Sequence, residues 1–260
     1  MASQPQAEPL ESLAQLAKAV SDFQQGLQCW LEQNGEALAS FVQRLAEGLA
    51  AFDKYRTEQE AEDFAALAQG GWIGLERHFT YQQIRAAATI CRSSGINEMN
   101  DAMLHYFSNN DFASLKRITN GWATIPYFRD RQAIIQDAMN AHCTGQFTLS
   151  IPAVLPLAEG LAAETLGTTS TRAIQNAAEV WKAEEAEAWS LEFWNVVNQV
   201  IYKRYDFGKD TATYLNRHGI LHGRVSNYAN AFNSTRVFLL VDVIADLWRR
   251  NQKPAQLNTP

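Results

Sequence analysis

The sequence has few of the residues that build disulfide frameworks, metal clusters or frequent turns. Three cysteines, Cys29, Cys91 and Cys143, are scattered along 260 residues. Their odd number and wide spacing fit neither a disulfide framework nor a metal site. We expect them to be free thiols in a reducing compartment. With only 14 glycines and 7 prolines, the chain has few points at which a helix must stop.

Patterns that would indicate another structural class are also missing. No runs of alternating apolar and polar residues, typical of half-buried strands, are found between turn signals. The sequence lacks the GxGxxG, P-loop, HExxH and GxSxG motifs. Alanine, leucine, glutamine and glutamate are abundant in the first two thirds, and these residues favour helices. The sequence therefore predicts an all-α protein.

Targeting and membrane signals are equally scarce. The N-terminus lacks a basic segment followed by an apolar run, so no signal peptide is expected. No apolar stretch is expected to reach the roughly 20 residues that span a bilayer. The best candidate, residues 237–248, contains Asp242 and Asp246. We therefore predict a cytoplasmic protein that has no membrane partner.

The balance of charge is acidic overall but uneven along the chain. The net charge is −6 and the pI about 5.4, which argues against a general nucleic-acid coat protein but not against a local basic groove. Residues 1–76 contain 12 acidic and 4 basic side chains. Residues 202–224 contain five basic side chains, including Lys203 and Arg204, against two acidic ones. The cationic segment is thus confined to one part of the chain.

Two apolar seams in the first 52 residues predict an N-terminal helical element. The first seam has heptad spacing and the second follows Asn34-Gly35; their members are Leu13, Leu16, Val20, Phe23, Leu27 and Trp30, then Leu38, Phe41, Val42, Leu45, Leu49 and Phe52. An Asn-Gly pair is typical of a turn. We therefore expect an antiparallel helical hairpin within residues 10–69, packed either on the body of the same chain or on a second copy.

The remaining residues, 70–253, are expected to form an all-helical body, with a boundary at Gly70-Gly71. Apolar periodicity and helix-capping residues predict its main helices, at residues 81–92, 96–107, 112–118, 126–142, 157–166, 183–205 and 233–250. The last of these has an apolar stripe and is predicted to be the central core helix. Glu159 falls among apolar neighbours, so its carboxylate should either reach water or pair with a cation.

The segment from residue 214 to residue 224 concentrates the possible chemistry. Arg217 precedes His222 by five residues, and His218 lies between them. An imidazole can exchange a proton near neutral pH, and a guanidinium binds phosphate oxygens. These are the groups needed for metal-free RNA cleavage, with Asn216 and His218 as additional donors to phosphate.

Helix geometry leaves other interpretations open. Residues five apart differ by about 140° around an ideal helix, so Arg217 and His222 would share a face only if Gly219 distorts the helix or a two-fold dimer pairs two copies. His218 and His222 are four apart and could form a metal pair, with Glu159 or Asp210 recruited as a third ligand. Alternatively, these polar groups only cap helix ends.

The string LNRHGILHG at residues 215–223 resembles the signature of HEPN domains (higher eukaryotes and prokaryotes nucleotide-binding), as found in bacterial abortive-infection and defence proteins. The upstream segments RDRQAII at 129–135 and IPAVLPLAEG at 151–160 are also similar. The resemblance covers about residues 125–250 and excludes the predicted hairpin. In this chain, histidine follows Arg217 where asparagine is commoner in the family.

The resemblance implies an up-and-down helical bundle, frequent homodimers, no cofactor and often metal-independent endoribonuclease activity. Arg217 and His222 would be the active pair. Glu159 would be a supporting carboxylate. The polar and basic neighbours of the pair would position RNA; they are Asn216, His218, Arg224, Lys203 and Arg204. Such a protein would act in a prokaryotic defence or toxin–antitoxin system, with an antitoxin or other defence protein as a further partner. The family also implies an alternative, a non-catalytic module that binds a nucleotide or a protein.

Overall fold

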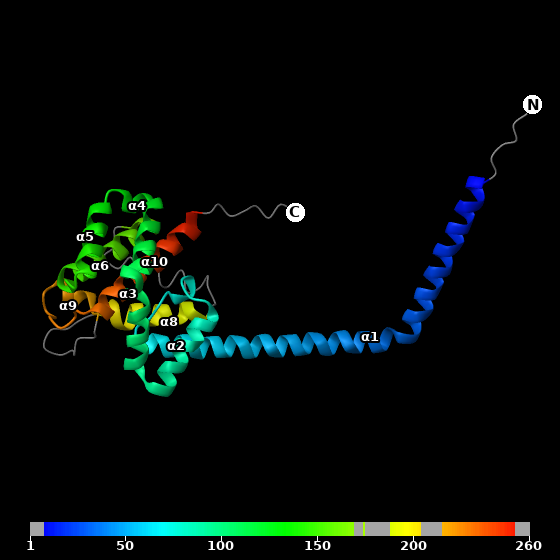
Figure 1. Ribbon diagram of the computed structural model, residues 1–260, viewed down its shortest axis with the longest axis horizontal. Coiled ribbons are helices and arrows are strands. Elements are labelled where there is room, and N and C mark those ends of the chain that lie inside the picture. Colours follow the sequence, from blue (N-terminus) through cyan, green and yellow to red (C-terminus); the bar gives the residue numbers. More distant parts are fainter. Residues whose placement is uncertain (1–7, 169–173, 175–187, 204–214, 253–260) are drawn as a thin grey trace, which may run out of the picture. The chain divides into compact units, whose positions relative to one another are not determined.

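The structure, a computed structural model, describes residues 8–168, 174, 188–203 and 215–252. The regular secondary structure of these residues is helical and includes no strand, which confirms the all-α class (Figure 1). The chain divides into a unit that ends at Arg56 and a body that begins at Thr57. The helices are α1 (Glu8–Gln69), α2 (Tyr81–Ser94), α3 (Ile96–Gly121), α4 (Pro126–Arg129), α5 (Gln132–Cys143), α6 (Phe147–Thr165), α8 (Ala188–Val196), α9 (Arg217–Leu221) and α10 (Ala231–Gln252), with 3₁₀ turns at Leu75–Arg77 and Trp122–Thr124.

In place of the predicted antiparallel hairpin, α1 is a single helix that bends in its N-terminal part without reversing its direction (Figure 1). A single glycine in a helix costs only about 1 kcal/mol relative to alanine, so Asn-Gly permits a turn without imposing one. The last part of α1, from residue 57, belongs to the body. There Asp63 is buried, accepts a hydrogen bond from the Tyr81 hydroxyl and pairs with Arg92 at 2.7 Å.

The core of the body is built around α10, as its apolar stripe predicts. Residues 233–245 of α10 are all buried, and the helix packs against α3 and α6. The core cluster to which it belongs includes large aromatic side chains, namely Trp72, Phe107, Trp122, Phe128, Phe193 and, from α10 itself, Phe238. Helix α5 covers another side of α6, and α2 packs on α3. The site region therefore rests on helices that are themselves held in the core.

Helix α6 begins ten residues earlier than expected and contains both prolines, Pro152 and Pro156. Pro156 is exposed and Pro152 half-buried, so the carbonyls that lose a helical partner lie toward solvent. Its opposite side is buried at Ile151, Leu155 and Leu161. By length and composition α6 could also cross a membrane, with a mean hydropathy of 1.2. The buried core helix of a globular protein passes the same test.

Two of the predicted helix boundaries differ from the structure for local reasons. The helix expected at residues 126–142 is broken into α4 and α5, since Asp130 and Arg131 lie outside both helices. Helix α3 contains a non-helical link at residues 109–112, which matches the two helices expected there. The helix expected at residues 183–205 is described from Ala188 and ends in a π turn at Val197–Ile201.

A buried ionic network ties the start of the body to α10. Asp242 accepts hydrogen bonds from His78 Nε2 and from Trp122 Nε1, each at 2.9 Å. Arg77 lies 3.2 Å from Asp242 and 2.7 Å from Asp246. The hydrogen bonds from His78 and Trp122 and the positive charge of Arg77 outweigh burial and hold the pKa of Asp242 below its usual value. The carboxylate therefore acts as a structural hub.

Candidate functional site

The short helix α9 is fixed at its start by Asn216. The Asn216 side-chain oxygen accepts a hydrogen bond from the Gly219 backbone N–H at 2.8 Å, which is an N-cap. Its Nδ2 donates to the Lys203 carbonyl, also at 2.8 Å, and Asn216 is buried. Both polar ends of this side chain therefore hold the backbone. The contact of Asn216 with phosphate stays a prediction. The two hydrogen bonds do not favour it, because they use both polar groups of the side chain.

The other end of α9 is closed by Gly223. This residue has a φ of 66°, in the left-handed region that glycine adopts freely. The N–H groups of Arg224 and Val225 donate to the Gly219 carbonyl at 2.8 and 3.1 Å. A Cβ on Gly219 would lie 2.4 Å from Val225 Cγ2. The two glycines in the site segment are thus required by this tight reversal of the chain.

The central feature of the site is an ion pair between Arg217 on α9 and Glu159 on α6. Nη2 of Arg217 donates to Oε2 of Glu159 across 58 residues of sequence. The side chains are 18% and 13% exposed, so solvent screens the pair less than a surface pair. Oε1 of Glu159 and Nε of Arg217 are buried with no hydrogen-bond partner within the described ranges. These two atoms leave capacity for a further polar group.

Tyr202 is buried within electrostatic range of this ion pair, and it was not identified from the sequence. It is buried, and burial raises the pKa of its hydroxyl, with the charge of Glu159 raising it further and that of Arg217 lowering it. The pKa therefore lies well above its usual value, and the hydroxyl stays protonated. Tyr202 follows the π turn, and its only signal in the sequence is that it precedes the basic segment.

The two histidines lie side by side along α9. His218 is half-buried and His222 is exposed at the C-terminal end of the helix. Their ring centroids are 6.0 Å apart and the ring planes differ by 14°, as expected for residues four apart. Among the described residues, the Arg217 guanidinium donates to Glu159 and not to His222. Within one chain the predicted active pair therefore shares a helix without a hydrogen bond between the two side chains.

Two other residues predicted to position RNA, Lys203 and Arg224, are among the described residues. Lys203 is exposed, and its carbonyl is the acceptor for Asn216. Arg224 is exposed just after the left-handed glycine. Arg204 lies outside the described residues, as does Asp210. Basic residues thus precede and follow α9 along the chain; we call Lys203, Arg217 and Arg224 the basic rim.

The described residues near His218 and His222 supply no further ligands for a metal ion. In the parts of the chain that the structure describes, no group of three or more His, Cys, Asp or Glu side chains is arranged to hold a metal ion. Glu159, the carboxylate considered as a third ligand, is paired with Arg217.

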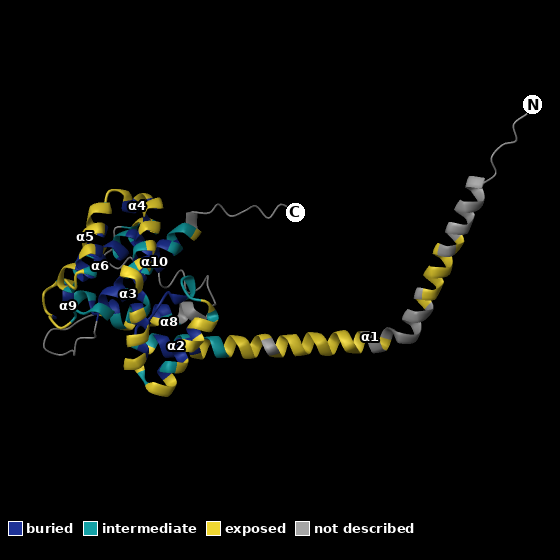
Figure 2. Cartoon of the chain, viewed as in Figure 1, coloured by how far each residue is buried: buried dark blue, intermediate teal, exposed yellow. Residues whose placement is uncertain are grey.

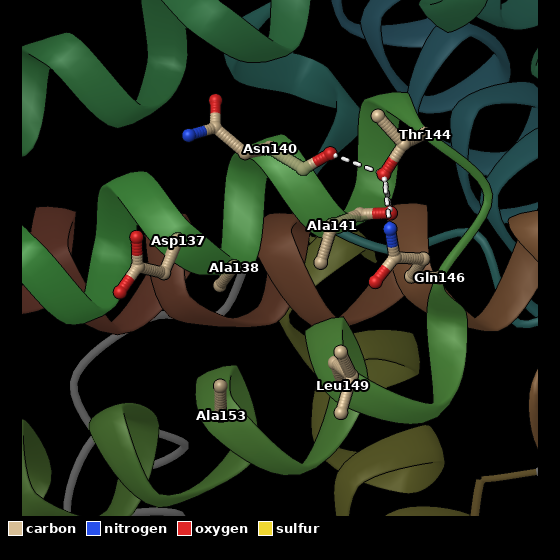
Figure 3. Close-up of a pocket in the computed structure, with 8 residues that line it drawn as sticks. All are labelled: Asp137, Ala138, Asn140, Ala141, Thr144, Gln146, Leu149 and Ala153. Carbon is tan, nitrogen blue, oxygen red and sulfur yellow. Dashed lines mark hydrogen bonds between the residues drawn. The ribbon is translucent and has the colours of Figure 1, made fainter.

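A separate surface cleft of about 370 Å³ lies between α5 and α6 (Figure 3). Its lining comes from α5, from α6 and from the turn between them, and includes Asp137 and Asn140 of α5 and Leu149 of α6. Thr144 donates to the Asn140 carbonyl at 2.9 Å, and Gln146 donates to Thr144 at 3.2 Å. None of the residues predicted to act on RNA lines this cleft. Its described polar contacts stabilise the turn between the helices.

No family model, no curated protein and no solved structure matches this chain.

Proposed function

We propose that this protein is a metal-independent endoribonuclease with its site at the junction of α6 and α9. In this proposal, residues 125–250 form a HEPN-like up-and-down bundle. The protein is a cytoplasmic effector of a prokaryotic defence or toxin–antitoxin system, and RNA is its substrate. The observation that carries the proposal is the ion pair of Glu159 and Arg217, because it joins two of the segments on which the resemblance rests.

The proposed reaction is attack of a ribose 2′-oxygen on the neighbouring phosphorus. A base removes the 2′-hydroxyl proton, the 2′-oxygen forms a bond to phosphorus, and the bond to the 5′-oxygen breaks as that oxygen gains a proton. Imidazole titrates near pH 6.5 and can both accept and donate that proton. His222 is exposed to a substrate at the end of α9. We assign it the role of general acid or base.

Arg217 stabilises the negative charge that accumulates on the phosphate oxygens. A guanidinium has five N–H donors, and the hydrogen bond to Glu159 uses one of them. Glu159 holds the guanidinium in a defined orientation, which is a positioning role. The neutral hydroxyl of Tyr202 lies near both side chains. Lys203, Arg204, His218 and Arg224 would bind the RNA backbone around this centre, with Asn216 fixing α9.

The test is an RNA-cleavage assay in EDTA with total RNA and tRNA as substrates. We expect the parent protein to cleave, and His222→Ala and Arg217→Ala each to reduce the rate at least about 100-fold, because general acid–base groups contribute on that order. Matched controls are His105→Ala and Arg129→Ala, two exposed residues outside α9. Circular dichroism should show the same helicity in all five proteins.

Cleavage by His222→Ala at the parental rate would contradict the assignment of the site. Glu159→Gln gives an independent check on orientation, since it keeps the side-chain shape but removes the charge that holds Arg217. We expect Glu159→Gln to lower the rate by less than Arg217→Ala does. A rate equal to that of the parent would remove Glu159 from the proposal.

The alternative function is a non-catalytic module that binds a nucleotide or a protein. The observation in its favour is that Arg217 is bonded to Glu159 while His222 is exposed at the other end of α9. A binding module would retain nucleotide or RNA affinity in the parent protein without any cleavage in EDTA. It would lose that affinity in Arg217→Ala but keep it in His222→Ala.

A further inference from the structure

Glu76 is a buried carboxyl group that the proposed reaction does not use. It lies in the 3₁₀ turn at Leu75–Arg77. Both of its carboxyl oxygens are buried without a hydrogen bond to another described residue. An ionised carboxylate in that position is costly, because it loses its hydration and gains no partner. The carboxyl group is therefore stable there only in its protonated form, unless a cation moves to meet it.

The charged groups around Glu76 come from its own turn and from α10. In the turn, Nε of Arg77 lies 3.2 Å from Oδ2 of Asp242, and its Nη1 lies 2.7 Å from Oδ2 of Asp246. On α10, Nε of Arg250 donates to Oδ2 of Asp246 at 2.7 Å. The charges of Arg77, Arg250 and Asp242 all act on Glu76. With Glu76 neutral, two carboxylates and two guanidinium groups balance each other.

Three further side chains border this cluster. Nε2 of His78 bonds to Asp242 at 2.9 Å, and Nη2 of Arg249 donates to the Gly121 carbonyl at 2.9 Å. Trp122, from the neighbouring 3₁₀ turn, brings only an uncharged indole N–H to Asp242. Each of these side chains already has a partner within the cluster or beside it.

Arg250 is better placed than Arg77 to bind an ionised Glu76. Glu76 and Arg77 are neighbours in a 3₁₀ turn, so their side chains point about 120° apart. Arg77 is also held between two carboxylates, and its side chain is only 18% exposed. The Arg250 side chain is 46% exposed, so its guanidinium can turn without disturbing the core.

The burial of α10 leaves room for Arg250 to change partner. Residues 233–245 are buried, Asp246 is half-buried and Arg250 is exposed (Figure 2). The helix therefore emerges from the core between these last two residues. Because Asp246 is paired with both Arg77 and Arg250, it keeps Arg77 when Arg250 leaves. The exchange thus deprives no carboxylate of its last cation.

We propose that Glu76 and Arg250 form a proton-dependent switch at the end of α10. When Glu76 carries its proton, Arg250 is bonded to Asp246, as in this structure. When the carboxyl group releases its proton to water, the Glu76 carboxylate accepts hydrogen bonds from the Arg250 guanidinium, which leaves Asp246 to Arg77. The last turn of α10 is then tied to the turn that follows α1. The inference goes beyond the proposed RNA cleavage and does not depend on it.

The exchange falls near neutral pH. Burial raises the pKa of Glu76 from 4.5 to about 7, against the opposing charges of Arg77 and Arg250. A modest change of pH around 7 therefore changes the ionised fraction of Glu76. Because Arg250 binds only the ionised form, the switch operates over the same range of pH.

The first experiment follows the two side chains by NMR of the full chain between pH 5 and pH 9. We expect one glutamate carboxyl carbon, identified by its loss in Glu76→Gln, to titrate near pH 7. The Nε–H signal of Arg250, identified by its loss in Arg250→Gln, should shift with the same midpoint in the parent. In Glu76→Gln, which has the shape of the protonated side chain, the Arg250 signal should stay at its low-pH position. This variant retains His78, so titration of that imidazole cannot account for the difference.

The second experiment is a double-mutant cycle. Urea unfolding of the parent, Glu76→Gln, Arg250→Gln and the double variant is measured at pH 5.5 and pH 8.5. We expect no coupling between the two sites at pH 5.5, and at pH 8.5 a coupling of at least about 3-fold in the equilibrium constant of unfolding. The cycle of Asp246→Asn with Arg250→Gln should show more coupling at pH 5.5 than at pH 8.5. Glu98→Gln, at an exposed position of α3, is the matched control and should show no coupling to Arg250 at either pH.

The contrary results are equally specific. Titration of Glu76 near pH 4.5 would overturn the switch, as would titration near pH 7 without a shift of the Arg250 signal. An Arg250 signal that shifts equally in the parent and in Glu76→Gln would also overturn it. Equal coupling at both pH values would show that Arg250 keeps one partner. RNA cleavage enters none of these measurements, so failure of the proposed function leaves the test of the switch intact.

Discussion

At the scale of single residues, the body holds ionisable side chains in states that differ from those in water. His142 on α5 is 1% exposed, and its Nδ1 lies 2.7 Å from Ser234 Oγ, which is 2.8 Å from Ser150 Oγ. Phe112 and Phe238 contact its ring edge to face. Burial lowers the pKa of His142 from 6.5 to about 4. The imidazole is therefore neutral in the fold and hydrogen-bonded.

The buried imidazole of His142 predicts a loss of stability in mild acid. In the unfolded chain the pKa of His142 is near 6.5. Below that pH, His142 therefore binds a proton in the unfolded state but stays neutral in the folded state. Stability is full above pH 6.5 and falls as the pH drops toward 4, with a limit of about 3 kcal/mol. Between pH 7.5 and pH 5 we expect His142 to contribute a loss of about 2 kcal/mol.

The measurement is urea unfolding of the parent and of His142→Asn at the two pH values. His142→Asn should be less stable at pH 7.5 because packing is lost, but its stability should depend less on pH. His105→Asn, at an exposed position, should keep the parental pH dependence. Equal pH dependence in the parent and His142→Asn would contradict a buried neutral imidazole.

Glu76 is the opposite case among the described side chains. Both of its carboxylate oxygens are buried with no hydrogen-bond partner in the described part of the chain. Burial raises its pKa from 4.5 to about 7. The pKa of Glu76 is higher in the folded state than in the unfolded state. Its contribution to the free energy of unfolding is therefore complete below pH 4.5 and is lost as the pH rises through 7. Together the two groups narrow the pH range of greatest stability from both sides.

At the scale of elements, one glycine allows the 3₁₀ turn at Leu75–Arg77 to pack closely against α10. Gly74 has a φ of 70°, and it precedes the 3₁₀ turn at Leu75–Arg77. A Cβ at this position would lie 2.2 Å from Cγ2 of Val243 on α10. The left-handed backbone and the close approach both require glycine here.

Gly74→Ala should destabilise the protein by about 2–4 kcal/mol, because it adds a core clash to the cost of left-handed backbone. Gly167 is a matched control, since its φ is 60° and no described atom lies within 4 Å of the place that a Cβ would take. Gly167→Ala should cost only about 1–2 kcal/mol, the backbone part alone. Thermal and urea unfolding of both variants give the difference. Equal losses would mean that α10 relaxes around the new methyl group.

Helix boundaries show how far local patterns reach. The two seams predicted in residues 13–52 lie on one helix, α1, which bends in its N-terminal part and does not form a hairpin (Figure 1). The prolines of α6 suggested either a kinked or a late-starting helix over residues 157–166, and the structure begins the helix at Phe147 with Pro152 and Pro156 inside it. Residues typical of turns lower the stability of a helix, but packing against other elements can stabilise the helix by more than this loss.

At the scale of the whole molecule, charge is segregated by sequence region. The net charge is −6, yet Lys203, Arg217 and Arg224 gather near α9. A protein that binds RNA through these three groups would release about three counterions. The logarithm of its affinity should then fall with the logarithm of salt at a slope of about −2.

The salt dependence of RNA binding therefore tests the basic rim. We expect His222→Ala, which should not cleave, to lose about 20-fold in RNA affinity between 50 and 200 mM salt. Arg224→Gln in the same background should lower the slope by about 0.7, whereas Arg117→Gln, exposed on α3, should leave it unchanged. Fluorescence anisotropy with a labelled oligonucleotide gives both slopes. A slope near zero would contradict binding through phosphates.

The sequence by itself determined the all-α class, the core role of α10 and the apolar face of α1, because these follow from periodicity within one segment. It also marked Glu159 as a carboxylate that should either reach water or pair with a cation, and Arg217 as a candidate to bind phosphate. Only the tertiary structure decided that these two residues pair, and that Tyr202 is buried within electrostatic range of them. Contacts across 58 residues depend on how α6 and α9 pack together. Local sequence patterns carry no direct information about that packing.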